Sequence, residues 1–397
     1  MSLELPPPVS EAPTPWNWVR KNLFSTWYNS ILTIVCLVAI FQGLRGLLVW
    51  ATTKAQWYVI SAHLRLFFAG QYPTESIWRL WAIVAIVAFL GSLTWGNLQR
   101  QSLRWHRPVS IVGVATVLVV LLPIGLKDRL ILAGQIVLVA GGYWLGQQLK
   151  PNFSRWLFLA WVFSFPVVFW LLSGGLGLKQ VPTANWSGLL LTLLAAVVSI
   201  VLSFPIGVLL ALGRQSRLPV VRLFSILYIE VIRGLPLIGV LFLAQVMLPL
   251  FLPSELRFSG DRLLRAIAGL SLFSAAYLAE DVRGGLQAVP RGQREAARAL
   301  GLSPPLVVVL VVLPQALRAV IPALVGEFVG LFKETTLLSV FGLLEFLGIS
   351  LSILANPQFI GRYAEVYLFV GAIYWVFCYS MSSASRRLEA HLDVSQR

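Results

Sequence analysis

The run Glu295-Ala296-Ala297-Arg298-Ala299-Leu300-Gly301 is followed, after nine residues, by Val311-Val312-Leu313-Pro314. The residues that precede the glycine are good helix formers and predict a short helix. Gly301 can adopt the left-handed conformation that ends a helix, and Pro304-Pro305 prevents the helix from continuing. We therefore expect a short helix within residues 291–303.

This short helix is predicted to combine small side chains with a basic face. Ala296 and Ala297 would let another surface approach closely. Three arginines recur at spacings of three and four residues, namely Arg291, Arg294 and Arg298. Such a helix can dock in a groove of a soluble partner and carry the partner's motion into the membrane. The alternative, that it only places arginines at lipid headgroups, leaves the spacing between the glycine and the proline unexplained.

The rest of the chain predicts an all-α membrane protein. Of its 397 residues, 58% are hydrophobic and 12% are charged, a balance that excludes an ordinary soluble enzyme. Ten apolar runs are candidates for membrane-spanning helices. They are residues 27–50, 78–97, 109–126, 130–147, 155–173, 187–212, 222–250, 262–282, 319–350 and 364–384. The apolar stretch Leu306–Leu313 is too short to span and needs another role.

The basic residues favour one orientation in the membrane. The formal net charge of +15 would suggest nucleic acid in a soluble chain, but in a membrane chain it indicates cytoplasmic loops that face anionic lipid. With both termini in the cytoplasm, 18 of the 31 Lys and Arg residues lie on the cytoplasmic side and ten on the outer side. We therefore expect a multi-pass protein with cytoplasmic termini and no nucleic-acid partner.

Catalytic and cofactor motifs are absent from the sequence. No lysine follows a glycine, so there is no phosphate-binding loop of the P-loop type. His63, His106 and His391 lie far apart, which argues against a metal site. Cys36 and Cys378 lie within apolar runs and are interpreted as packing residues. The chain is therefore expected to be no enzyme and to bind no cofactor or metal.

The Glu295–Pro314 string resembles the EAA motif of the membrane subunits of ATP-binding-cassette (ABC) importers. That motif reads Glu-Ala-Ala, three residues, Gly, nine residues and Ile-x-Leu-Pro, and Val311 here replaces the isoleucine. Its place in the Arg283–Arg318 loop, two spans before the last one, also fits. Three flanking runs are similar to those of polar amino-acid permeases of the histidine, glutamate, glutamine and arginine type. They are Glu230–Leu237, Ala279–Leu286 with Pro290–Gln293, and Lys333–Val340.

The resemblance implies a permease subunit of an ATP-driven importer that moves amino acids across the plasma (inner) membrane of a bacterium. Its implied partners are an ABC ATPase dimer that holds the ATP, a second permease subunit that the extra front half suggests is a paralogue, and a periplasmic amino-acid-binding protein. The implied coupling residues are Arg291, Arg294, Glu295, Ala296, Ala297, Arg298 and Gly301. A secondary transporter or channel, a membrane scaffold, and an ABC permease for another substrate remain alternatives.

The resemblance covers about half of the chain. It implies a five-helix type I core over 187–386, after a disordered tail (1–26) and about five accessory spans (27–173), and before a second tail (387–397). The longer members of the group also begin with a tail and a Trp-rich span. The sequence assigns no task to the accessory spans, and enlargement of the lipid-facing shell is one role that stays open. The aromatic-rich loop at 51–77 is expected to form an interfacial helix.

Charged residues inside the predicted spans form the candidate translocation path. Such residues are expensive in a membrane and usually face a partner or a watery cavity. The candidate path residues are Glu230, Arg233, Glu327, Lys333, Glu334 and the neighbouring Thr335. Glu230 is the expected partner of Arg233, near a helix bend at Gly234 and Pro236. They either line a path suited to a zwitterion or form structural ion pairs.

Overall fold

The computed structural model describes residues 15–98, 126–149, 153–251 and 261–393, and these residues are almost entirely helical. Within these ranges the only strand-like features are two isolated bridges, one of them between Gly175 and Leu178. The expected all-α architecture is therefore confirmed for this part of the chain.

The chain divides into two compact units, Met1–Ser61 and Ala62–Arg397. In the first unit, α1 (Pro15–Leu23) precedes α2 (Trp27–Thr53), which begins where the Thr26 hydroxyl accepts a hydrogen bond from the Asn29 amide. The sequence predicts a disordered tail through residue 26, but α1 occupies part of that tail. The predicted span at 27–50 corresponds to α2.

Helix α3 (Tyr58–Ala69) spans the boundary between the two units, and the front part of the second unit then forms a small helical bundle. Helix α4 (Ile77–Leu98) packs against α6 (Leu126–Gln148) and α7 (Ser154–Ser173). These helices match the predicted spans at 78–97, 130–147 and 155–173. The predicted span at 109–126 lies outside the described residues except for its last residue.

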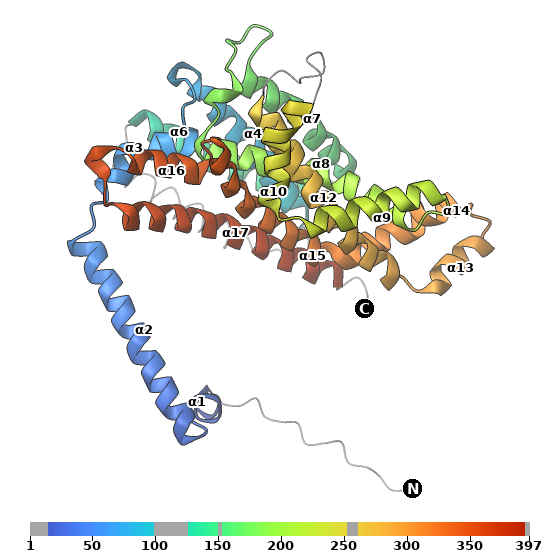
Figure 1. Cartoon of the computed structure of the whole chain (residues 1–397), viewed down its shortest axis with the longest axis horizontal. Coiled ribbons are helices and arrows are strands. Elements are labelled where there is room, and N and C mark those ends of the chain that lie inside the picture. Colours follow the sequence, from blue (N-terminus) through green and yellow to red (C-terminus); the bar gives the residue numbers. More distant parts are fainter. Residues whose placement is uncertain (1–14, 99–125, 150–152, 252–260, 394–397) are drawn as a thin grey trace. The chain divides into compact units, whose positions relative to one another are not determined.

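The back part carries the remaining helices (Figure 1). They are α8 (Gly188–Arg214), α9 (Pro219–Gly234), α10 (Leu237–Phe242), α11 (Leu248–Phe251), α12 (Arg262–Ala288), α13 (Arg291–Ala299), α14 (Pro304–Leu306), α15 (Leu313–Glu334), α16 (Phe346–Leu354) and α17 (Tyr363–Asp393). Two π-helical segments, Leu243–Met247 and Val307–Val312, join α10 to α11 and α14 to α15.

Helix α12 is the centre of this part of the molecule. It packs against α8, α9 and α15, and it contributes to two buried hydrophobic clusters. One cluster joins α8, α10 and α12, and the other joins α12 to Ala297 of α13 and to Val307 and Val312 at the start of the next helix. The short helix α13 is therefore anchored directly to the centre of the fold.

The described residues contain eight helices long and apolar enough to cross a membrane, or up to nine if one bent pair is counted as a span. That pair is α9 and α10–α11, which bend by 107° at Leu235-Pro236. The predicted bend at Gly234 and Pro236 is confirmed, but the predicted 222–250 run is two helices in different directions.

The boundaries predicted around residues 306–350 are wrong. Residues Pro304–Phe341 form one long helical segment, so the short stretch at 306–313 is its beginning and not a separate element. The π-helical turns come directly before Pro314, whose ring nitrogen has no hydrogen to donate to a regular helical ladder. The segment ends at Gly342, which has a φ of 75°, and α16 is a separate helix that begins after Glu345.

Candidate functional site

The residues of the Glu295–Pro314 string build α13 and the connection that follows it. The Gly301 amide donates to the Arg298 carbonyl at 2.9 Å, and the Leu302 amide donates to the Ala297 carbonyl at 3.2 Å. Gly301 has a φ of 82°. Together these bonds form a Schellman motif, which satisfies carbonyls at the helix end that would otherwise lack partners. The predicted role of Gly301 as the residue that ends the helix is confirmed.

One side of α13 is held by its own chain. Ala297 is buried in the hydrophobic cluster that includes Leu286 of α12 and Val312 before α15. The Arg294 guanidinium donates to the Leu286 carbonyl at 2.8 Å. Ala297 is buried and Arg294 is half-buried, so neither lies on the fully exposed face of α13, and their contact with an external surface stays a prediction. Three-residue spacing along so short a helix could not distinguish its outer face from its inner one.

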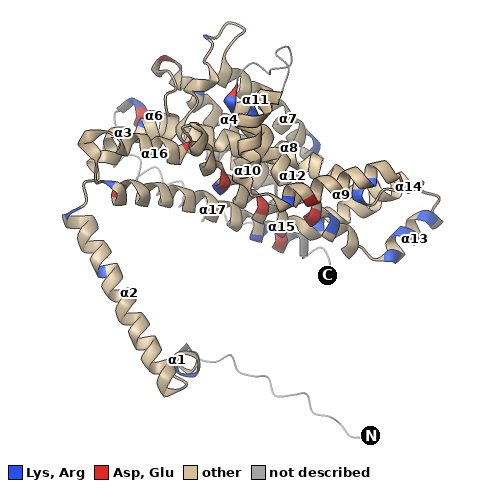
Figure 2. Ribbon diagram, viewed as in Figure 1, with Lys and Arg blue, Asp and Glu red and all other residues tan. Residues whose placement is uncertain are grey.

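The opposite side of α13 is exposed. Glu295, Ala296 and Arg298 are accessible, and Leu300 at the helix end is 84% exposed. Figure 2 shows basic residues along α13, at the edge of the molecule beside α14. The exposed face thus carries both charge and a large apolar side chain, as a docking surface for another protein does.

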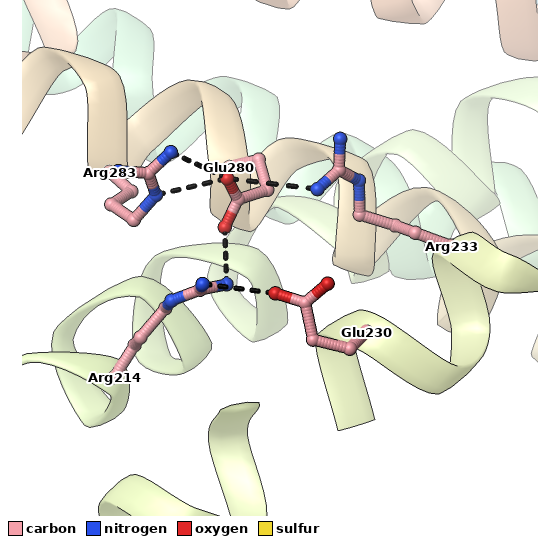
Figure 3. Close-up of polar contacts among 5 residues, drawn as sticks. All are labelled: Arg214, Glu230, Arg233, Glu280 and Arg283. Carbon is pink, nitrogen blue, oxygen red and sulfur yellow. Dashed lines mark hydrogen bonds and ion pairs between the residues drawn. The ribbon is translucent and has the colours of Figure 1, made fainter. Parts of the chain in front are cut away.

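A cluster of ion pairs lies near the C-terminal ends of α8, α9 and α12 (Figure 3). We call Arg214, Glu230, Arg233, Glu280 and Arg283 the Glu280 cluster. Glu280 is 2.7 Å from Arg214 Nη1, 2.8 Å from Arg283 Nη2 and 3.7 Å from Arg233 Nη1. The side chain of Glu280 is 15% exposed, so one largely buried carboxylate faces three guanidinium groups.

The pairing within this cluster corrects one sequence prediction. Glu230, expected to pair with Arg233, instead pairs with Arg214 of α8 at 3.0 Å. Arg233 pairs with Glu280 and lies over the ring of Tyr277, with 5.5 Å between guanidinium and ring centroid. Glu230 and Arg233 therefore join α9 to the neighbouring helices rather than to each other.

The other candidate path residues lie along α15 and just beyond it. Glu327 accepts a hydrogen bond from the Ser274 hydroxyl of α12 at 3.4 Å. Glu334 has one buried carboxylate oxygen without a described partner, while Lys333 is exposed. The Thr335 hydroxyl donates to the Phe332 carbonyl at 2.7 Å, so its hydrogen is used within its own helix. Among the described residues, no ion pair joins these groups to the Glu280 cluster.

Sequence reasoning missed three members of that cluster as candidate residues. Arg214 lies at the end of its span, and Glu280 and Arg283 lie within one helix at a spacing of three residues. An acidic residue inside an otherwise apolar span is itself a signal. This signal was available at Glu280, but the identity of its partners on α8 and α9 is not encoded in any local pattern.

The back half of the chain matches a known protein family. Residues 203–394 match the family model described as binding-protein-dependent transport system inner membrane component. A solved structure described as an amino acid ABC transporter with histidines is 32% identical, and the match covers 51% of this chain and 91% of that one, with a TM-score of 0.45.

Two relatives match nearly the whole chain. The inner membrane amino-acid ABC transporter permease protein YhdY of Escherichia coli is 40% identical over 96% of this chain and 93% of its own length. The glutamate/glutamine/aspartate/asparagine transport system permease protein BztC of Rhodobacter capsulatus is 36% identical over 99% of this chain and 96% of its own length. The similarity therefore includes the front half as well as the back half.

Proposed function

The chain belongs to the family of amino-acid ABC transporter permeases, and from this membership we propose that it is one membrane subunit of an ATP-driven amino-acid importer. In this proposal a separate binding protein delivers the amino acid from outside. Two permease subunits, this chain and a paralogue, form the path, and two ATPase subunits bind ATP. The chain crosses the inner membrane of a bacterium with both termini in the cytoplasm, and it has no enzymatic activity of its own.

The two faces of α13 carry the proposal. Its inner face is fixed to α12 through Ala297 and through the hydrogen bond from Arg294 to Leu286. Its outer face presents Glu295, Ala296 and Arg298. A helix fixed on one side and exposed on the other can transmit the movement of a docked protein to the helices that hold it.

The motion would reach the membrane through two helices. Val307 and Val312, which pack in the same cluster as Ala297, lie at the start of the long segment that includes α15. We infer that closure of the ATPases around ATP displaces α13, and that α12 and α15 move with it. The path then alternates between its inward-facing and outward-facing states.

The charged residues of α9 and α15 are the proposed contacts of the substrate path. An amino acid carries both an ammonium and a carboxylate, so Glu230, Arg233, Glu327, Lys333 and Glu334 offer both signs of charge, with Thr335 beside them. Glu230 and Arg233 are 55% and 37% exposed in the isolated subunit, which leaves them accessible to a bound molecule. Selection among amino acids is assigned chiefly to the binding protein.

The coupling role is tested by copurification of the ATPase. Ala296→Leu adds bulk to the exposed face of α13 and is expected to reduce ATPase recovery and substrate-stimulated ATP hydrolysis at least tenfold. The matched control is Ala355→Leu, an alanine next to α16 that is also exposed. Normal ATPase recovery with Ala296→Leu would refute docking through this face.

The path residues are tested one at a time by removing their charge, with substrate-stimulated ATPase activity as the readout. Glu230→Gln, Arg233→Gln, Glu327→Gln, Lys333→Gln and Glu334→Gln are compared with Arg217→Gln, an exposed arginine outside the group. A change in substrate dependence at one or more sites, with normal assembly, is expected. Unchanged substrate dependence at all five sites would instead show that these charged residues have only a structural role.

A secondary transporter or channel makes the opposite prediction about energy. It would transport its substrate in vesicles that contain no ATPase, whereas the importer requires ATP and both partners. Uptake by vesicles that contain only this chain and its paralogue would therefore refute the proposed mechanism. Uptake of another substrate class by the full complex would change the proposed substrate but leave the ATP-driven mechanism intact.

A further inference from the structure

A basic cavity of about 600 Å³ lies between the ends of α8, α9, α12 and α13. Five arginines line it, together with apolar and amide side chains, and among the described residues no aspartate or glutamate does. The arginines are Arg214, Arg222, Arg283, Arg291 and Arg294. Such a lining is complementary to an anion large enough to meet several guanidinium groups.

The charges of this cavity are only partly neutralised. Arg214 and Arg283 pair with Glu280, which lies outside the lining. Arg222 and Arg291 have no ion pair or hydrogen bond from their side chains among the described residues. Arg294 donates to a backbone carbonyl, but its buried Nε has no partner. The cavity therefore retains unused donors and positive charge.

The start of α13 adds to this field. Pro290 precedes the first turn and Arg291 is its first residue, while Val289 and Arg291 both line the cavity. The first amide groups of a helix lack partners within the helix, and the helix dipole makes this end positive. The positive end of the α13 dipole therefore lies beside the cavity, although the Gln293 amide already donates to the Pro290 carbonyl.

An apolar surface begins next to the cavity. On α9, Arg222 and Ile226 line the cavity, while the adjacent Leu223, Phe224 and Leu227 are exposed by 67%, 64% and 59%. Within one short helix, a charged site therefore adjoins a surface suited to hydrocarbon chains. A free inorganic anion would use only the first of these two features, whereas a phospholipid would use both.

We propose that this cavity binds the headgroup of an anionic phospholipid, with the phosphodiester among the arginines and the acyl chains along α9. A headgroup with net negative charge is favoured, because the ammonium of a zwitterionic lipid would find no acidic partner in the described lining. The inference rests on the proposed function in one respect only, the leaflet that supplies the lipid. With the proposed orientation, the cavity lies at the cytoplasmic surface of the membrane. By occupying this position, the lipid would fix the base of α13.

The test measures lipid binding to the purified full-length chain by native mass spectrometry. The probes are short-chain phosphatidylglycerol, short-chain phosphatidylcholine and inorganic phosphate. Arg222→Gln is expected to weaken phosphatidylglycerol binding about fivefold, the factor that one basic residue contributes at an anionic surface. Arg291→Gln should do the same. Arg217→Gln is the matched control, an exposed arginine five residues away that does not line the cavity.

Selective loss in the two cavity variants, with the control unchanged, supports the site. Equal loss in the control would overturn it, because the effect would then be general surface charge. Binding of phosphate as tight as that of phosphatidylglycerol would overturn the lipid assignment in favour of a free anion.

A second occupant of the cavity to be considered is an acidic segment of the ATPase. The same titration, repeated on the complex with the ATPase, distinguishes it from the lipid. Retained phosphatidylglycerol binding supports the proposal, and its loss would assign the cavity to an acidic segment of the ATPase. Because the first titration uses the isolated chain, its failure can be distinguished from failure of the importer proposal, which ATPase copurification tests.

Discussion

Glu280 is the residue on which the ion pairs of three helices converge. It contacts arginines of α8, α9 and α12, and its side chain is 15% exposed. Removing one partner from a largely buried cluster leaves the other charges without compensation, which costs far more than the net value of the pairing. Glu280 therefore controls whether Arg214, Arg233 and Arg283 can remain where they are.

We predict that Glu280→Gln destabilises the chain by roughly 3 kcal/mol, because three arginines lose their common carboxylate. Glu230→Gln is the control within the same cluster. Glu230 is 55% exposed and pairs once, so its loss should cost at most about 1 kcal/mol. Thermal unfolding of the purified variants checks the difference. Similar melting temperatures for the two would show that Glu280 is not the centre of the cluster.

A second prediction concerns two adjacent glycines of α12. A Cβ at Gly285 would lie 2.5 Å from the Ala316 carbonyl oxygen of α15, whereas a Cβ at Gly284 would meet no atom within 4 Å. Gly285→Ala should therefore separate α12 from α15 and lower stability by about 2 kcal/mol. Gly284→Ala should be neutral or stabilise by up to about 1 kcal/mol, because alanine is the better helix former. Thermal unfolding of the two variants measures whether each substitution lowers or raises stability. Equal changes in melting temperature would contradict the close approach of α12 and α15 at Gly285.

Helix α13 is the element in which sequence and structure agree best, because its form is local. The glycine, the prolines and the helix formers lie within one short stretch, and they determine where the helix ends. Which face of α13 is buried and which is exposed could not be predicted, because this depends on contacts with α12 and with Val312. For the same reason, Glu230 was assigned the partner nearest in sequence although Arg214 is the one nearest in space.

The helix boundaries near Pro314 were harder to predict. Proline ordinarily ends or kinks a helix, so a loop through residue 318 was the natural expectation. The π-helical turns over Val307–Val312 let the chain enter α15 without interruption. Such π-helical turns are rare and occur as single turns inside α-helices, so an expectation built on regular helix patterns omits them.

The third prediction distinguishes the two faces of α13 by an identical substitution. Ala297→Leu overfills the buried cluster and should lower stability by about 2 kcal/mol, with α13 displaced. Ala296→Leu changes an exposed position and should leave stability unchanged while it impairs ATPase recovery. Thermal unfolding combined with ATPase copurification separates the two effects. Equal melting temperatures for both variants would contradict the assigned orientation.

At the scale of the whole molecule, the second unit joins front and back through buried polar contacts. The Tyr72 hydroxyl donates to the Leu172 carbonyl at 3.0 Å, and the ring lies in the cluster that includes Leu191 of α8. The Gln71 amide donates to the Ser187 hydroxyl at 2.7 Å, directly before α8 begins. Arg79, which is buried, donates to the Lys179 carbonyl. The front segment is therefore part of the packing around α8, and does more than enlarge the lipid-facing shell.

The last prediction tests this junction at Tyr72, which is fully buried. Tyr72→Phe keeps the ring and should cost about 1 kcal/mol through the lost hydrogen bond, whereas Tyr72→Ala also leaves a cavity and should cost about 4 kcal/mol. The matched series is Tyr367→Phe and Tyr367→Ala, at a tyrosine that is 42% exposed. If the front segment only extended the shell, the two series would have equal effects on thermal unfolding. A graded loss at Tyr72, with small changes at Tyr367, instead follows from a core that residues of both halves build together.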